Sequence, residues 1–179
     1  MTPSQPTPAQ MRHALGHFAT GVTVVTGLSA DGAPVGFACQ SFASVSLDPP
    51  LVLFCADHRG RSWPRMRDSG IFTVNVLRHD QRELVERFGS SAGRRFDGLD
   101  WSASPQGAPS LPGVLMRIHC AVQDVHAAGD HDVVIGRVQA VEEGEPGRPM
   151  LFYRGRLSVT ERASSLRYEV PGGWDDYWG

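Results

Sequence analysis

Apolar and β-branched residues in the first third of the chain form short runs separated by turn residues. Residues 21–55 predict three successive strands, because VTVVTGL and PVGFACQ are β-branched or alternating and LVLFCA is apolar at successive positions. Between the first two runs, Asp31 and Gly32 form a pair typical of hairpin turns. This region predicts a β-rich core, with the small neutral stretch ACQS in its middle.

A helix is predicted near the N-terminus. Thr7, followed by proline, is a typical helix start, and Met11, Leu15 and Phe18 then lie on one apolar stripe. We expect this short amphipathic helix to end near Gly21.

Two further helices carry start and stop signals. Ser62 can cap a helix that holds a proline in its first turn and that Gly70 ends. Asp80 and Glu83 have the spacing of a capping box, and Gly89 is placed to end the helix that follows them.

The second half of the chain alternates loops and strands. Residues 90–113 are rich in Gly, Pro and Ser and lack periodicity, so we expect a surface excursion that could act as a lid. Strands are predicted over 114–128, 132–141 and 150–159. About seven strands with two or three helices predict a mainly β fold, an antiparallel, Greek-key-like barrel, rather than a βαβ fold.

The chain divides into three predicted parts. Residues 1–9 form a Pro-rich, disordered lead, 10–160 form one domain, and 161–179 form an irregular tail whose aromatic residues could dock on a neighbour. The lead lacks a charged start followed by an apolar region, so we expect a cytoplasmic protein. No apolar run reaches the roughly 20 residues that a membrane span needs.

Charge and residue usage exclude several functions. A net charge of −2 offers no broad basic surface for nucleic acid. Three cysteines at wide spacing argue against both a disulfide framework and a cysteine metal site. All 17 basic residues are Arg, which excludes a phosphate-loop lysine and a Schiff-base lysine.

Known catalytic and cofactor motifs are weak or absent. The stretch GSSAG matches the pattern of a hydrolase nucleophile elbow, but a helix rather than a strand precedes it, so Ser91 is not expected to be a nucleophile. The histidines lack metal-ligand spacing, and no metal site is predicted. No G-x-G-x-x-G follows a strand, which excludes a Rossmann dinucleotide site.

Two stretches remain that fit a flavin nucleotide. Small residues near Ala38 let the backbone approach a flat ring, and Gln40 and Ser41 add neutral donors and acceptors. A helix start flanked by Arg59 and Arg61 suits a phosphate. The alternative is that these are an ordinary strand end and an ordinary helix cap.

From about Met11 to Val159, the sequence resembles the short-chain flavin reductase family, whose members share the flavin-binding split barrel. The matching pieces include FATGVTVVT, GFACQSFASVSLDPPLVLFC, RSW, FTVNVL, RRFDG, GDHDVVIGRV and LFYRG, in the family's order. The similarity is closest to reductase components of two-component flavin-dependent monooxygenases, such as that of actinobacterial steroid A-ring degradation. The tail lies outside the resemblance.

The resemblance implies a flavin reductase that uses NADH as the hydride donor, with NADPH as the alternative donor. Such an enzyme transfers hydride to FAD or FMN and releases the reduced flavin to a separate monooxygenase, and it is expected to be a homodimer whose partner completes the groove. Two alternatives stay open. One is a non-catalytic flavin-binding split barrel, and the other is an enzyme similar to pyridoxamine phosphate oxidase, whose basic pocket usually includes lysines.

The resemblance also implies roles for single residues. The flavin ring would lie against Gly36, Phe37, Ala38, Cys39, Gln40, Ser41, Phe54 and Cys55. The phosphate would lie at Arg61 and Ser62, and the outer edge of the flavin at Phe88 and Gly89. The nicotinamide nucleotide would meet His131, Tyr153 and Arg154. His131 is the candidate catalytic residue, as a positioning and hydrogen-bonding group rather than an obligatory acid or base.

Overall fold

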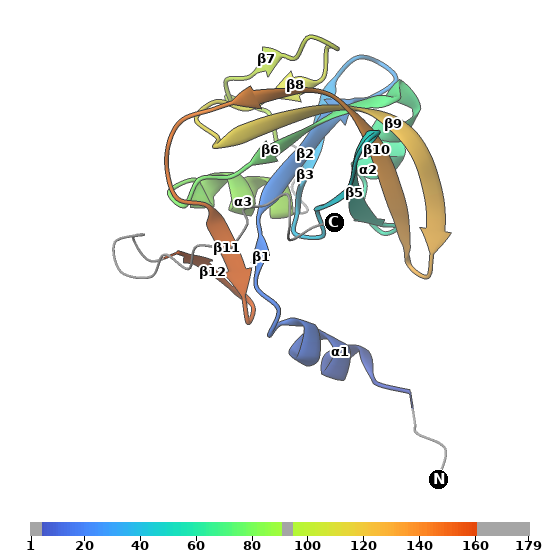
Figure 1. The fold of residues 1–179 in the computed structure, drawn as a ribbon, viewed down its shortest axis with the longest axis vertical. Coiled ribbons are helices and arrows are strands. Elements are labelled where there is room, and N and C mark those ends of the chain that lie inside the picture. The colour runs from blue at the N-terminus through green and yellow to red at the C-terminus, as the bar shows by residue number, and fades with distance from the viewer. Residues whose placement is uncertain (1–4, 91–94, 161–179) are drawn as a thin grey trace.

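A seven-stranded antiparallel sheet forms the body of the protein (Figure 1). The computed structural model describes residues 5–90 and 95–160. In sheet order the strands are β3 (Pro34–Cys39), β2 (Thr23–Leu28), β6 (Ile71–Val76), β9 (Met116–Ala128), β10 (His131–Glu143), β5 (Pro50–Asp57) and β4 (Ala43–Leu47).

Smaller elements surround this sheet. A three-stranded sheet is formed by β1 (Thr20–Gly21), β11 (Met150–Tyr153) and β12 (Arg156–Val159), and a two-stranded sheet by β7 (Ser102–Ala103) and β8 (Pro109–Ser110). The helices are α1 (Pro8–Leu15), α2 (Trp63–Met66), the 3₁₀ turn η1 (Arg67–Ser69) and α3 (Arg82–Gly89). None of the helices in the described ranges is long and apolar enough to cross a membrane.

The large sheet curls into a barrel. Its two edge strands follow each other in sequence, since β3 ends at Cys39 and β4 begins at Ala43. Such a short link reaches from one edge to the other only if the edges approach each other. Ser41, just after β3, is bound to β5, because its hydroxyl accepts a hydrogen bond from Cys55 N at 3.0 Å and donates one to Cys55 O at 3.2 Å. The predicted antiparallel barrel is confirmed.

Two apolar clusters lie on opposite faces of the central strands. Successive side chains of a strand alternate between faces, so Val24 and Val25 of β2 are both fully buried but belong to different clusters. One cluster fills the barrel around Phe54 and Phe72, and the other includes Phe88 from α3. The position of α3 beside β3 follows from this second cluster.

Local turn and cap signals are confirmed at several positions. The predicted hairpin joins β2 to β3, with Gly32 at a φ of 79°. Thr7 forms a capping box with Gln10 and begins α1, which ends at Leu15 rather than near Gly21, because Gly21 belongs to β1 and pairs with Leu151 of β11. The region predicted as three strands holds an additional one, β4, whose mostly exposed, Ser-rich sequence gives only a weak strand signal.

The predicted caps of the other helices are wrong. Ser62 stands at the N-cap of α2 but makes no side-chain cap hydrogen bond, and α2 is only four residues long. Gly70 ends this segment as predicted, at a φ of 70°. Asp80 caps no helix, because its carboxylate accepts a hydrogen bond from Arg78 Nε at 2.7 Å, and α3 begins after Gln81.

Residues 95–113 are more than a surface excursion. Thr26 Oγ1 donates to Pro109 O at 2.5 Å, and Leu111 N donates to Asn75 Oδ1 at 2.9 Å. Both Thr26 and Asn75 are fully buried, so this segment covers part of the barrel. The expected lid stays a prediction, and Ser91 and the C-terminal tail lie outside the described residues.

Candidate functional site

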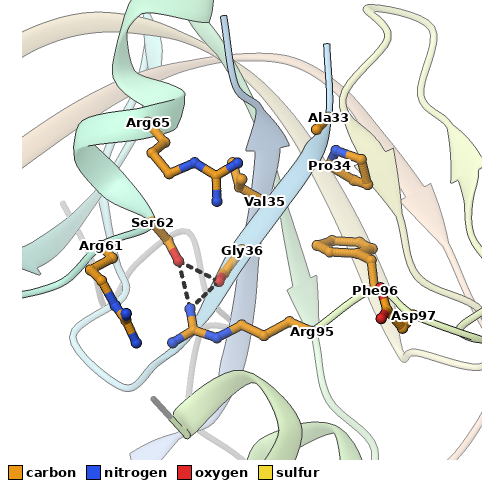
Figure 2. Close-up of a pocket in the computed structure, with 10 residues that line it drawn as sticks. All are labelled: Ala33, Pro34, Val35, Gly36, Arg61, Ser62, Arg65, Arg95, Phe96 and Asp97. Carbon is orange, nitrogen blue, oxygen red and sulfur yellow. Dashed lines mark hydrogen bonds between the residues drawn. The ribbon is translucent and has the colours of Figure 1, made fainter. Parts of the chain in front are cut away.

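A hollow of about 350 Å³ opens between β3, the start of α2 and residues 95–97 (Figure 2). This volume is in the range of small-molecule sites. Arg61 and Arg65 line it from the start of α2, and Arg95 lines it from a distant segment of the chain. The structure therefore concentrates positive charge that the near-neutral composition does not reveal.

Arg95 is half-buried at the floor of this hollow. Its guanidinium donates to Gly36 O at 2.6 Å, to Ser62 Oγ at 2.5 Å and to Ser90 O at 2.5 Å. These acceptors are neutral, and Arg95 forms no ion pair with any residue of 5–90 and 95–160. Burial, and to a smaller extent the charge of Arg61, lower the pKa of Arg95. A half-buried cation without a counter-charge favours binding of an anion.

Gly36 is required where β3 crosses the floor of the hollow. A Cβ at this position would lie 2.9 Å from Val25 O and 3.0 Å from the Phe88 ring, closer than normal contacts. Its carbonyl accepts from both Ser62 Oγ, at 2.8 Å, and Arg95. The close packing of β3 on α3 thus determines where the backbone of Gly36 lies in the hollow.

Arg59 and Ser62, both near the predicted phosphate site, have other partners than the sequence suggested. Arg59 is committed to Asp57, with Nε at 3.1 Å and the second guanidinium nitrogen at 2.7 Å from its carboxylate, and this contact holds the pKa of Asp57 well below its usual range. The Ser62 hydroxyl is held by Gly36 and Arg95 instead of capping α2. Positive charge at this place comes from arginine side chains, not from a capped helix start.

A second, smaller hollow continues from the same residues toward the end of β5. It measures about 90 Å³ and shares Arg61, Ser62 and Arg95 with the first hollow. Its other walls include Phe37 and Asp57. The two hollows lie next to each other and share these three residues, and we refer to them together as the groove.

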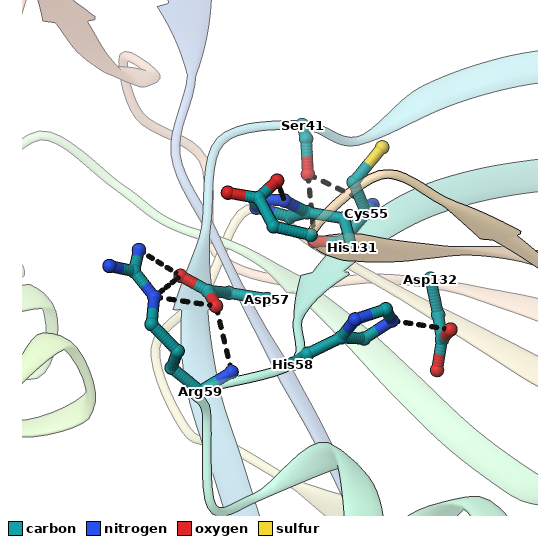
Figure 3. A network of polar contacts seen from close by, with 8 residues as sticks. Ser41, Cys55, Asp57, His58, Arg59, His131 and Asp132 are labelled. Atoms are coloured by element: carbon teal, nitrogen blue, oxygen red, sulfur yellow. Dashed lines mark hydrogen bonds and ion pairs between the residues drawn. The ribbon is translucent and has the colours of Figure 1, made fainter. Parts of the chain in front are cut away.

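The end of β5 lies against the beginning of β10 (Figure 3). Cys55 pairs with Val133 and Asp57 pairs with His131, so all four side chains project from one face of these two strands. Phe54 projects from the other face and is fully buried. Of the predicted ring contacts from β5, only Cys55 has a side chain on the open face.

Two other predicted flavin contacts are core residues. Phe54 packs edge to face on Phe37, Trp63 and Phe72 with ring centroids 5.1 to 5.8 Å apart. Phe88 is 1% exposed in the second cluster, so it does not lie at an outer edge. Both side chains are buried, so neither is exposed on the surface of the groove.

The remaining predicted ring contacts surround the end of β3. Cys39 is buried and its Sγ lies 3.3 Å from Ser41 Oγ, while Gln40 is exposed and accepts from Thr20 Oγ1 at 3.5 Å. Gly89, at the end of α3, lies beside Ala38, whose Cβ is 3.9 Å from the place of a Cβ on Gly89. All three cysteines are free, and none of the described residues forms a metal-binding cluster.

His131 stands at the first position of β10. Its Nδ1 lies 2.6 Å from Asp130 Oδ1, its side chain is 38% exposed, and its Nε2 has no hydrogen-bond partner among residues 5–90 and 95–160. The contact with His131 lowers the pKa of Asp130. One nitrogen of the imidazole is thus held by a carboxylate, and the side chain is partly exposed.

Asp132 braces this region, a role that the sequence did not reveal. One carboxylate oxygen accepts from Trp63 Nε1 at 2.9 Å, and the other lies 2.8 Å from His58 Nε2. Trp63 opens α2, so Asp132 ties that helix to β10. The sequence did hold one clue to this role. Neighbouring residues of a strand project from opposite faces, so Asp132 had to point away from the face that holds His131.

We expect Asp132→Ala to lower the free energy of unfolding by about 1 to 3 kcal/mol, because the buried Trp63 N–H loses its acceptor. The hydrogen bonds from His58 and Trp63 lower the pKa of Asp132. This contribution is therefore complete above the ordinary aspartate pKa of about 3.9 and is lost as the pH falls through the lowered value. Urea unfolding at several pH values measures it. Asp124→Ala, an exposed change on β9, is the control. An equal loss of unfolding free energy in both variants would contradict the stabilising role of Asp132.

Tyr153 and Arg154 form a separate group at the turn between β11 and β12. Arg154 has a φ of 48°, the only positive value at a non-glycine residue in the described ranges. Its guanidinium carbon lies 5.5 Å from the centre of the Tyr153 ring, and one nitrogen lies 2.6 Å from His17 Nε2. Figure 1 shows this turn and the β9–β10 hairpin on opposite sides of the molecule. Within one chain, the predicted nicotinamide contacts are not brought together.

Comparisons with known proteins agree with this fold. A family profile described as "Flavin reductase like domain" matches residues 15–161. The chain is 48% identical over 169 residues to "Flavin-dependent monooxygenase, reductase subunit HsaB" of Rhodococcus jostii (strain RHA1), covering 94% of this chain and 84% of that protein.

Two solved structures have similar folds. One is nitrilotriacetate monooxygenase component B from Mycobacterium thermoresistibile, with a TM-score of 0.86, 45% identity and 92% of each chain covered. The other is the NADH:FAD oxidoreductase SgcE6 of Streptomyces globisporus in complex with NAD and FAD fragments, with a TM-score of 0.82 and 32% identity, covering 90% of this chain and 99% of that one.

Proposed function

The chain belongs to the flavin reductase like domain family, and on that premise we propose that its groove is the reaction site of an NADH-dependent flavin reductase in the cytoplasm. The enzyme reduces FAD or FMN and supplies the reduced flavin to the oxygenase component of a two-component monooxygenase. The flavin and the nicotinamide supply the hydride chemistry, and the protein supplies binding and orientation.

One observation carries the assignment of the groove. Arg95 is half-buried, donates only to neutral acceptors and lies beside Arg61, so the site is built for an anion that brings counter-charge. A flavin nucleotide joins such an anion to a flat ring, and beside these arginines the smaller hollow offers the apolar surface of Phe37, Ala56 and Trp63. The residues present therefore fit a flavin.

Residues at different positions in the groove would bind different parts of the flavin and the nicotinamide nucleotide. Arg61 and Arg95 hold the phosphate, and the segment from Phe37 to Ser41 lies along the ring with its backbone donors and acceptors. His131, oriented by Asp130, presents Nε2 to the nicotinamide nucleotide and positions it against the ring. These side chains orient two bound molecules, and none has to exchange a proton.

NADH consumption by the purified protein tests this function. We expect NADH oxidation that depends on added FAD or FMN and saturates with both substrates. Flavin binding without NADH oxidation would support a non-catalytic flavin-binding protein. Turnover of pyridoxamine phosphate in place of NADH would support the alternative oxidase.

We also propose that the enzyme is a homodimer. Helix α1 buries none of its residues, and Met11, Leu15 and Phe18 are 43%, 63% and 75% exposed. An isolated helix of about two turns is marginal in water, so this apolar stripe needs a partner surface. A second copy of the chain would also offer a Tyr153 and Arg154 turn to the groove, which the same chain holds apart from His131.

Light scattering at micromolar concentration checks the assembly. We expect a mass about twice the 19.5 kDa of one chain, and Phe18→Ser combined with Leu15→Glu should shift the protein toward monomer because it removes apolar contact area. A fully active monomer of the unaltered protein would contradict the dimer.

A further inference from the structure

His17 links helix α1 to the turn between β11 and β12. Its Nδ1 lies 2.9 Å from His13 O, and its Nε2 lies 2.6 Å from a guanidinium nitrogen of Arg154. The backbone adds a second link, since Arg154 N donates to Gly16 O at 2.9 Å. One imidazole thus connects two segments that are 137 positions apart in the sequence.

The two contacts of the His17 ring allow only one form of it. A carbonyl oxygen can only accept, so Nδ1 carries the proton that is donated to His13 O. An arginine nitrogen can only donate, so Nε2 must be unprotonated to accept from Arg154. Both bonds are therefore made by the neutral imidazole with its proton on Nδ1. A protonated ring would direct a second N–H at the guanidinium and lose that bond.

Arg154 stands at a backbone position that arginine rarely occupies. It forms a two-residue hairpin loop with Gly155, and positive φ values of 48° and 75° at these two residues are the pattern of a type I′ turn, which favours Asn or Gly. Strain of this kind is typical of residues whose side chain is needed at that place. The guanidinium of Arg154 lies between the His17 ring and the Tyr153 ring, both of which leave its charge intact.

No carboxylate lines the two hollows beside this contact. The hollow of about 530 Å³ next to His17 and the adjoining one at the turn contain no Asp or Glu. Their charged and titratable groups, besides His17 itself, are Arg12, His13, Tyr153, Arg154 and Arg156. A protonated His17 would therefore be repelled by Arg154 with no acidic group to compensate, whereas an anionic ligand would be attracted to this place.

We propose that His17 is a positioning residue for the nicotinamide nucleotide, and that it holds Arg154 toward the phosphates of this nucleotide only while its imidazole is neutral. This inference rests on the proposed function and on the homodimer, because the turn of one chain then reaches the groove of the other. Protonation of His17 releases the Arg154 side chain. NADH binding should therefore weaken as the pH falls through the range in which histidines titrate.

Steady-state kinetics of NADH oxidation at saturating flavin, between about pH 5.5 and 8.5, tests this role. We expect the KM for NADH of the unaltered protein to rise on the acid side. His17→Gln should match the unaltered protein at about pH 8 and lack about three- to tenfold of the acid rise, because its amide oxygen accepts from Arg154 without titrating. His17→Phe, which offers no acceptor, should show the raised KM at every pH. Since His131 titrates in the same range, the profiles of the variants are compared with one another.

Two further variants show whether His17 acts through Arg154. His13→Gln changes the neighbouring imidazole, whose ring centre lies 5.0 Å from that of His17, and it should keep the acid rise. In an Arg154→Gln background, His17→Phe should have no further effect on the KM, because the contact that it removes is already absent. Equal changes of the pH profile by His17→Gln and His13→Gln would overturn the positioning role, and so would additive effects of His17→Phe and Arg154→Gln.

Nitrogen NMR of the histidine rings gives a measurement that does not need turnover. At about pH 8 we expect the proton of His17 on Nδ1, and a proton on Nε2 would overturn the contact with Arg154. Absence of NADH oxidation at every pH would overturn the proposed function and the role of His17 in it. Parallel pH profiles of the unaltered protein and His17→Gln, in an active enzyme, would overturn the role of His17 alone.

Discussion

Riboflavin should bind this protein about ten to a hundred times more weakly than FMN, because it lacks the phosphate that makes a charge-assisted contact of about 1.5 to 3 kcal/mol. Arg95→Ala should weaken FMN and FAD binding by a similar factor and leave riboflavin binding nearly unchanged. The variant removes the half-buried guanidinium between Gly36 and Ser62, an interaction partner that riboflavin never has. Arg61→Ala should likewise reduce the difference in affinity between riboflavin and the two phosphate-bearing flavins.

Fluorescence titration of the three flavins against each variant measures these ratios. Riboflavin affinity reports on damage to the ring site, so a variant that loses affinity for all three flavins equally has only distorted the groove. Arg82→Ala is the matched control, since Arg82 is an exposed arginine of α3 that pairs with Glu86. An unchanged ratio in both Arg95→Ala and Arg61→Ala would place the phosphate elsewhere.

His131→Ala should raise the KM for NADH about tenfold to a hundredfold, while the affinity for flavin stays nearly constant. The reason is the loss of one oriented hydrogen-bonding group, worth about 1 to 3 kcal/mol. Asp130 lies 2.6 Å from Nδ1 and fixes the direction in which Nε2 points. Asp130→Asn should therefore give a smaller rise in KM, because the imidazole stays present and loses part of its orientation.

Steady-state kinetics at saturating flavin measures the KM, and flavin titration of the same variants serves as the control. A KM for NADH equal to that of the unaltered protein, combined with weakened flavin binding, would reverse the assignment and place His131 at the flavin.

The order and type of most elements were predictable because they depend on residues close together in sequence. The Asp31-Gly32 pair sets a tight turn by its own backbone preferences, and Thr7 reaches Gln10 one helical turn away. The motifs shared with flavin reductases then indicated which segments form the site. Interactions over a few residues are thus encoded directly in the sequence.

In the candidate site, contacts between residues far apart in the sequence could not be predicted in this way. Arg95 stands in an irregular segment without a motif, yet it donates to Gly36 and Ser62, which are 59 and 33 positions away. Asp80 has the spacing of a capping residue, but Arg78 takes its carboxylate while also pairing with Glu145. A single sequence does not show which of several possible partners a polar side chain takes.

The sequence by itself determined the β-rich class, the turns, the start of α1 and the stretches from which the groove is made, since short-range sterics and hydrogen bonds fix these features. Only the tertiary structure decided that Phe54 faces the core while Cys55 faces the groove, because that choice depends on the register between β5 and β10. It also decided that Arg95 meets Arg61 and Arg65 of a distant segment in one hollow, since closure of the barrel and packing of α3 on β3 bring the two segments together.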